Sequence, residues 1–149
     1  MKKYAFIGIA LAFGVLAYSQ TQPEELKPSV MQEQTSQTAD IKVEKLTVCT
    51  GIENKEPVGE AVTFARETGK VYTWTKLSAK TFPTKIKHAY YVNQKKAGEI
   101  ELAVKFSSFR TWSSKNVWPG AWKVEALDEA GNLLSVMEFT ITSQSQITQ

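Results

Sequence analysis

The sequence predicts an all-β fold, namely a small antiparallel β-sandwich of the immunoglobulin-like kind that follows a signal peptide and a disordered tether. Several runs alternate apolar and polar residues with a period of two, which is typical of half-buried antiparallel strands. Turns that contain Gly, Pro or Asn separate these runs. No window keeps the 3.6-residue period of an amphipathic helix, so we expect essentially no helix in the domain.

The N-terminus has the composition of a secretory signal peptide. Lys2 and Lys3 form a positive start, and residues 4–18 are uncharged and rich in apolar side chains. A spanning helix needs roughly 20 apolar residues, so this run is short for a membrane anchor. We therefore expect a cleaved signal over residues 1–19 and a bacterial periplasmic or secreted protein. Anchoring in the inner membrane by an uncleaved signal is the alternative.

Two further segments are expected to lie outside the folded part. Residues 20–42 contain five glutamines, two prolines and no aromatic residue, so they bury too little apolar surface to offset the entropy of ordering. Residues 143–149, SQSQITQ, resemble a flexible tail. The predicted organisation is a signal peptide, a disordered linker, one sandwich domain over residues 43–142, and this tail.

Six segments are expected to form strands, because their apolar residues alternate or because they are rich in β-branched and aromatic residues. In the last of them the apolar phase slips between Val136 and Phe139, which predicts a β-bulge near Met137. The expected strands are residues 43–50, 71–77, 85–92, 99–106, 122–127 and 133–141.

Three turns are expected between these strands. Asn93–Lys96 separates two alternating runs and predicts a hairpin. In Trp118–Ala121, Pro and Gly occupy the central positions of a type II turn. Asp128–Gly131 fits a type I turn that a left-handed glycine closes.

The charge pattern argues against a nucleic-acid partner. Removing Lys2 and Lys3 from the 18 basic residues leaves 16 against 15 acidic residues, a net charge of +1. A nucleic-acid binder is expected to gather its basic residues on one face and to have a pI above about 9. Lysines 85, 87, 95 and 96 are the best such patch, and we interpret them as the solvated rim of a hairpin.

The residue types in the sequence give little support for a catalytic, cofactor or metal site. The chain has one histidine, His88, and one cysteine, Cys49, whereas a transition-metal site needs several such ligands. Cys49 can form no internal disulfide and is expected to be a half-buried apolar residue. Glu53 and Glu56 lie in a loop without the Asp/Asn ladder of a calcium loop. We therefore predict no catalytic residue, no cofactor and no metal, with His88 expected in the core.

The most specific chemistry lies between Arg110 and Trp118. Arg110 and Trp112 share one face of a strand, where a guanidinium can stack on an indole. Trp118 precedes the Pro-Gly turn and is expected to be exposed, whereas Trp74 and Trp122 are expected in the core. The alternative is a structural clasp at the edge of the sandwich. The candidate binding residues are Arg110, Trp112, Ser113, Ser114, Lys115 and Trp118.

These features favour an exported, non-catalytic module that binds another envelope component, in the first place a protein. A carbohydrate-binding module that stacks a cell-wall or extracellular glycan on Trp112 and Trp118 is the alternative. An enzyme that uses His88 is the least favoured of the three. Nucleic acid is not expected as a partner, nor is the membrane beyond an uncleaved signal anchor.

Six stretches, in order and spread over residues 45–142, carry a resemblance. They are TGIENKEPVGE (50–60), VYTWTKL (71–77), HAYYVN (88–93), RTWSSK (110–115), GAWKVEALDEAGNLL (120–134) and FTI (139–141). Together they resemble the bacterial family known as domain of unknown function 2914. The resemblance implies a small β-rich domain behind an export signal or a membrane segment, and it carries no activity over to this chain. That family tends to have Asn-Gly where this chain has Asn93-Gln94, and because Gln resists a positive φ, a longer turn is expected here.

Overall fold

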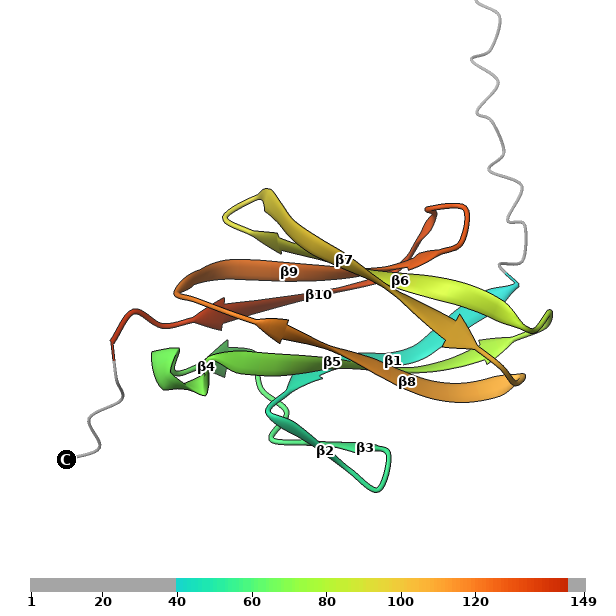
Figure 1. The fold of residues 1–149 in the computed structure, drawn as a ribbon, viewed down its shortest axis with the longest axis horizontal. Helices are drawn as coiled ribbons and strands as arrows, with labels where there is room; N and C mark the ends of the chain where they lie inside the picture. Colours follow the sequence, from blue (N-terminus) through green and yellow to red (C-terminus); the bar gives the residue numbers. More distant parts are fainter. Residues whose placement is uncertain (1–39, 145–149) are drawn as a thin grey trace, which may run out of the picture. The chain divides into compact units, whose positions relative to one another are not determined.

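Seven long strands form two sheets in the computed structural model, which describes residues 40–144 (Figure 1). The first sheet has the strand order β1-β5-β8 and the second the order β4-β10-β9-β6-β7. Neighbouring strands are antiparallel, except that the short β4 (Thr63–Phe64) runs parallel to β10. The long strands are β1 (Ile41–Cys49), β5 (Lys70–Ala79), β6 (Thr84–Val92), β7 (Lys95–Val104), β8 (Ser108–Asn116), β9 (Gly120–Asp128) and β10 (Leu133–Ile141).

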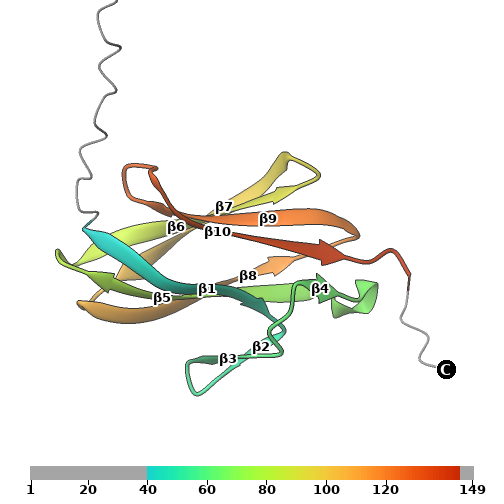
Figure 2. The same ribbon diagram turned by 180° about the vertical axis from the view of Figure 1, so that it is seen from behind.

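The strand order is that of an immunoglobulin-like sandwich. If the seven long strands are lettered A, B, C, C′, E, F and G along the chain, the sheets read A-B-E and G-F-C-C′. The two sheets face each other as separate layers (Figures 1 and 2). The predicted antiparallel β-sandwich is confirmed. The one helical turn in residues 40–144 is the 3-10 helix η1 (Arg66–Thr68).

The alternation along each strand puts one face of each sheet into a shared core. Trp122 and Trp74 are both buried, as predicted. Trp122 lies between the two sheets, whereas Trp74 lies on the outer face of the first sheet. The larger core cluster comprises Val48, Phe64, Val71, Tyr90, Val92, Val117, Trp122, Val124, Phe139 and Ile141. The smaller cluster comprises Ile41, Leu77, Ala79, Ile86 and Val104.

The pairing register defines two ends of the sandwich. At the end that we call the amino end, β1 begins opposite the last residue of β5, and the loops 80–83, 105–107 and 129–132 connect strands. At the opposite end, which we call the carboxyl end, β10 finishes opposite the first residue of β9. Residues 93–94 and 117–119 make the turns there. The two ends therefore present different loops to their surroundings.

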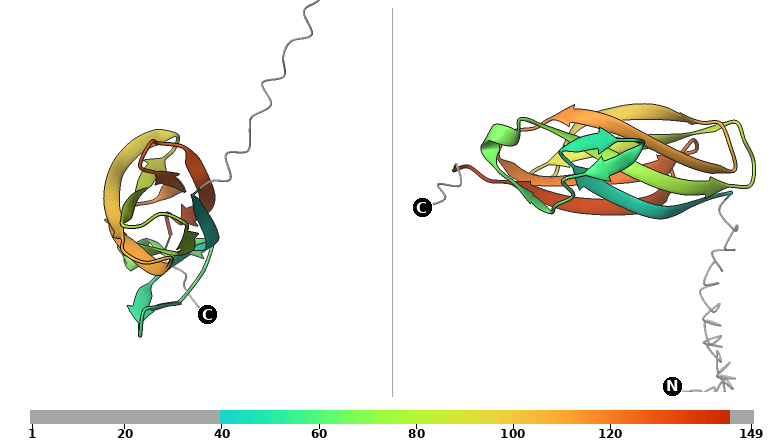
Figure 3. Two further views of the ribbon diagram at one scale, coloured as in Figure 1. Left: turned by 90° about the vertical axis from the view of Figure 1, so that its right-hand side faces the viewer. Right: turned by 90° about the horizontal axis from the view of Figure 1, so that it is seen from below.

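A short hairpin covers the outer face of the first sheet, and its strands are not among those expected from the sequence. It consists of β2 (Gly51–Glu53) and β3 (Glu56–Val58), joined by Asn54 and Lys55. Both turn residues have positive φ, 49° and 63°, as a tight two-residue hairpin turn requires. Seen from below, the hairpin lies across the middle of this sheet (Figure 3). Glu53 and Glu56, expected in a loop, lie in these two strands, which are too short at three residues each to show a period in the sequence.

The folded part begins earlier than predicted. Strand β1 starts at Ile41, which is buried and pairs with Ala79, so residues 41 and 42 belong to the domain rather than to the linker. Because polar residues flank this single apolar residue, the composition of the segment does not indicate that it belongs to the domain. The predicted signal peptide, the linker up to residue 39 and the tail from residue 145 lie outside the described residues. Within residues 40–144, no helix is long and apolar enough to cross a membrane.

Three predicted turns and bulges need correction, and one turn is confirmed. Gln94 has a φ of 69° and Asn93 one of 47°, so the hairpin turn has two residues and is not longer. Gly120 has a φ of 151°, far from the roughly 80° of a type II turn, and it already belongs to β9. The register of β10 shifts between Leu133 and Ser135 rather than near residue 137. The turn that ends at Gly131 is confirmed by its hydrogen bond to the Asp128 carbonyl, 3.0 Å, and its φ of 91°.

Candidate functional site

Strand β8 divides the predicted binding residues between its two faces. Arg110, Trp112 and Ser114 point to the outer face of the first sheet, whereas Ser113 is buried between the sheets. Because side chains along a strand point alternately to its two faces, consecutive residues of β8 cannot all lie on one surface. Ser113 therefore does not belong to any surface that Arg110 and Trp112 form, which corrects its assignment as a surface donor.

Arg110 fastens the β2–β3 hairpin onto the sheet. Its Nε atom lies 3.0 Å from Oε1 of Glu56 in β3. Trp74, the cross-strand neighbour of Trp112, donates its indole Nε1–H to the carbonyl oxygen of Lys55 at 2.9 Å. These contacts hold the hairpin over Trp74, which is only 2% exposed. The arrangement around Arg110 is thus a clasp, in line with the structural alternative, although it closes a hairpin onto a sheet face and not a sandwich edge.

Lys115 joins the two sheets where β8 passes β7. Its ammonium group donates to the carbonyl oxygen of Ala97 at 2.7 Å. The accepting carbonyl belongs to β7, the edge strand of the second sheet. Unpaired backbone groups on an edge strand can pair with another chain and so promote aggregation. Ser114 is exposed nearby. We therefore assign Lys115 a structural part.

Trp118 is the predicted site residue that the structure leaves open. Its side chain is 48% exposed at the carboxyl end of the sandwich. Its ring meets that of the buried Trp122 edge to face, with centroids 4.8 Å apart and planes at 71°. Trp122 in turn stacks on Phe139 at 5.9 Å, and Phe139 meets Phe64 at 6.0 Å. Trp118 is therefore the exposed last member of an aromatic row that reaches into the core.

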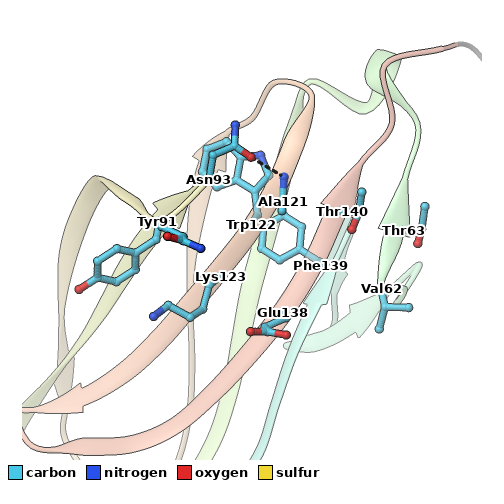
Figure 4. A pocket seen from close by; sticks show the side chains of 11 residues that line it. Val62, Thr63, Tyr91, Asn93, Ala121, Trp122, Lys123, Glu138, Phe139 and Thr140 are labelled. Atoms are coloured by element: carbon cyan, nitrogen blue, oxygen red, sulfur yellow. Dashed lines mark hydrogen bonds between the residues drawn. The ribbon is translucent and has the colours of Figure 1, made fainter.

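A groove of about 830 Å³ lies at the same end, over β4, β10, β9 and the tip of the β6–β7 hairpin (Figure 4). Tyr91 and Lys123 are cross-strand neighbours on its floor, and the Lys123 ammonium lies 4.5 Å from the centre of the Tyr91 ring. Asn93 closes one side, where its Oδ1 accepts from the Ala121 backbone at 3.1 Å. The lining residues are Val62, Thr63, Tyr91, Asn93, Gln94, Ala121, Trp122, Lys123, Glu138, Phe139 and Thr140.

The groove combines both signs of charge with hydroxyl and amide groups. The Lys123 ammonium is 2.7 Å from Oε1 of Glu125, and this hydrogen bond raises the pKa of Lys123. Glu138 of β10 is the neighbour of Lys123 across the ladder. Sequence reasoning missed this groove, because Tyr91 and Lys123 become neighbours only when β6 pairs with β9. Their outward phase in the alternating runs was the only available signal.

A chain of hydroxyl groups surrounds the single histidine between the sheets. Nε2 of His88 lies 2.8 Å from the Thr75 hydroxyl and Nδ1 lies 2.7 Å from the Ser113 hydroxyl. The Tyr90 hydroxyl continues the chain, at 2.7 Å from Ser113 and 2.8 Å from Thr73. Burial lowers the pKa of His88 from 6.5 to about 4. His88 is therefore a hydrogen-bonded core residue, as predicted.

This buried chain satisfies its own polar groups instead of presenting them to a substrate. Both ring nitrogens of His88 are occupied by hydroxyls, and His88 itself has no exposed surface. Cys49 is also buried, more completely than predicted, and burial raises the pKa of its thiol. In residues 40–144 no group of three or more His, Cys, Asp or Glu side chains is placed to hold a metal ion.

Residues 83–141 match the family model described as "Protein of unknown function (DUF2914)". The resemblance to this family that the sequence indicates is confirmed over these residues. The matched segment runs from the residue before β6 to the end of β10, so that it contains Trp118, His88 and most of the groove. The β2–β3 hairpin, together with its contact residue Trp74, precedes the match. No curated protein is similar enough to the chain to count as a match.

Proposed function

We propose that this DUF2914 protein is an exported, non-catalytic module of the bacterial envelope that binds a protein partner at the carboxyl end of its sandwich. The binding surface consists of Trp118 and the groove that Figure 4 shows, and we call it the carboxyl-end surface. This placement revises the surface expected from the sequence: Trp118 stays in it, whereas Arg110, Trp112, Ser113, Ser114 and Lys115 leave it.

The observation that carries the proposal is the exposed Trp118. Its carbonyl oxygen accepts the Trp122 indole hydrogen bond at 2.8 Å, and its ring rests on the Trp122 ring. The side chain is thus held in place and yet nearly half exposed. An aromatic side chain that is already ordered loses little entropy on binding, and Trp is enriched among the residues that dominate protein interfaces.

The groove beside it favours a polypeptide over other ligands. Lys123 and Glu138 place opposite charges next to each other, which suits a partner that carries both signs. The Lys123 ammonium covers one face of the Tyr91 ring, so that this ring offers less stacking surface to a sugar. Hydroxyl and amide side chains along the groove supply further hydrogen bonds.

A non-catalytic role agrees with the use that the fold makes of its reactive side chains. His88 and Ser113 are within hydrogen-bond distance, but both are buried and engaged with Thr75 and Tyr90. A general base must reach the proton that it removes from a substrate. His88 lies where no substrate has access to it in this conformation.

Glycan binding is the second candidate, and the polar wall of the groove is the observation that favours it. Thr63, Asn93 and Thr140 line the groove on two sides, and such groups hydrogen-bond to sugar hydroxyls. Trp118 would supply the stacking surface. Retention on peptidoglycan that free protein ligands do not compete away would favour this candidate.

The test is affinity capture from envelope extract with the full chain and three variants as bait. Trp118→Ala and the double variant Tyr91→Ala/Lys123→Ala change the carboxyl-end surface, whereas Arg110→Ala is the matched control on the other sheet. We expect a partner that the wild type and Arg110→Ala capture equally and that the two surface variants lose. Equal capture by all four proteins contradicts the proposed surface, and circular dichroism verifies that each variant is folded.

A further inference from the structure

Three loops at the amino end each expose one large apolar side chain. Phe82 in the β5–β6 loop is 47% exposed, Phe106 in the β7–β8 loop is 62% exposed, and Leu133 after the β9–β10 turn is 58% exposed. These loops lie at the end where β1 begins (Figures 1 and 2). The ring of Phe106 lies beside the half-buried ring of Phe109, with centroids 6.0 Å apart. The amino end is thus the second place where the fold leaves large apolar groups in water.

Polar residues flank these apolar side chains along the sequence. Each comes from a different loop, and Lys80, Lys105 and Ser107 lie between or beside them. A protein partner recognises a continuous, well-packed patch with a desolvated centre. Exposed apolar side chains at the ends of strands, with polar neighbours in the sequence, instead suit the interface of a lipid bilayer, which is fluid and closes around each of them.

Lysines without an acidic partner lie beside the tips. On the faces of the sheets, Lys45, Lys76 and Lys85 are each paired with a glutamate, as are three further lysines. Within the described part of the chain, Lys80 and Lys105 form no ion pair, and both are exposed. Long basic side chains beside apolar ones can bury their stems while their ammonium groups reach lipid phosphates.

Acidic residues at the amino end keep the electrostatic contribution to lipid binding modest. Asp40 and Glu129 are exposed there, against the exposed Lys42, Lys80 and Lys105. The apolar tips must therefore supply most of the affinity, and the basic residues add a preference for anionic lipid.

The chain itself reaches the domain at the amino end. Residue 40 is the first described residue, and Ile41 opens β1 beside Ala79. The uncharged run 4–18 precedes it by about 22 residues. The part of the chain that carries this run therefore joins the domain at its amino end and not beside Trp118.

We propose that the amino end is a membrane-docking surface, on which Phe82, Phe106 and Leu133 enter the interfacial region of an anionic bilayer. The carboxyl-end surface lies at the opposite end of the sandwich. Docking then presents Trp118 and the groove away from the lipid, toward a partner in the envelope. This extends the expectation from the sequence, which limited membrane contact to an uncleaved signal anchor.

The test uses the full chain with an environment-sensitive fluorophore on a single introduced thiol, since Cys49 is buried. Phe106→Cys places the label at the amino end, and Trp118→Cys places it at the carboxyl end as a control. Vesicles of phosphatidylglycerol and phosphatidylcholine are added, with and without brominated acyl chains. This readout responds to the depth of the label, so binding through residues 1–39 alone does not produce it.

We expect a blue shift and quenching by brominated lipid for the label at 106 and neither for the label at 118. Adding Phe82→Ser/Leu133→Ser should reduce the shift at 106, whereas the matched control Val58→Ser/Val136→Ser, which removes exposed apolar groups outside both proposed surfaces, should preserve it. An unshifted label at 106 on vesicle-bound protein overturns the proposal. So do equal shifts at both positions, or a shift at 106 that membrane-free envelope protein causes and vesicles do not.

Discussion

Trp122 donates its indole N–H to the carbonyl oxygen of Trp118 at 2.8 Å, and the two rings meet edge to face at 4.8 Å. One tryptophan is 2% exposed and the other 48%. The buried ring thus positions the exposed one through both its backbone and its side chain. The four-residue spacing joins a surface aromatic in the β8–β9 connection to a core anchor in β9, so that the stability of the carboxyl end and its surface chemistry are linked.

This link makes the two tryptophans unequal in their contribution to stability. Trp122→Ala removes a buried ring that contacts Trp118 and Phe139, and we expect it to lower the free energy of unfolding by about 3–5 kcal/mol. Trp118→Ala removes a half-exposed ring and the edge-to-face contact, and we expect a loss of about 1–2 kcal/mol. Urea unfolding followed by circular dichroism measures both. Equal losses would show that Trp118 is part of the core and not a free surface group.

The sequence was sufficient for the sandwich but not for the site, and β8 shows why. β8 is absent from the six expected strands, although Arg110 and Trp112 were expected to share one strand face. The period of two in that strand also requires that Ser113 face away from both. The hairpin over Trp74 depends on two strands of three residues, too short to show a period. The groove depends on the register between β6 and β9, which joins residues 32 positions apart, as for Tyr91 and Lys123. Local pattern carries no information on either contact.

The clasp at the β2–β3 hairpin predicts a local effect on dynamics. Trp74→Phe removes the indole hydrogen bond to the Lys55 carbonyl, and we expect a loss of about 1 kcal/mol. Arg110→Gln breaks an ion pair that is exposed on both sides, and we expect a loss below about 1 kcal/mol. In both variants amide hydrogen exchange should accelerate in residues 51–58 and remain slow in β6. Unchanged exchange in the hairpin would mean that these contacts do not hold it.

The buried histidine predicts how stability depends on pH. The pKa of His88 is lowered from 6.5 to about 4 by burial, so the unfolded chain takes up a proton in this range before the folded protein does. The stability that this difference provides is complete above pH 6.5 and is lost as the pH falls through 6.5 toward 4. The full shift corresponds to about 3 kcal/mol.

The carboxylates also titrate in part of this range, so the measurement compares the wild type with His88→Gln. Gln keeps one donor and one acceptor for the hydroxyls of Thr75 and Ser113. We expect the free energy of unfolding of the wild type to fall more steeply between pH 7 and pH 4.5 than that of the variant. Parallel curves would show that folding does not lower the pKa of His88.

A substitution in the hairpin turn at Asn93 and Gln94 should increase the free energy of unfolding. Both residues have positive φ, and a glutamine in this left-handed region costs of the order of 1 kcal/mol, whereas glycine adopts it freely. Gln94→Gly also makes the unfolded chain more flexible, so we expect a net gain of about 0.5 kcal/mol in urea unfolding. Gly120→Ala is the opposing control at the same end: its φ is 151°, and an added Cβ would lie 3.0 Å from Cγ2 of Val92 and 3.1 Å from Oδ1 of Asn93. We expect that variant to lose about 1–3 kcal/mol. A loss of stability in Gln94→Gly would show that the glutamine side chain makes a contribution larger than its backbone cost.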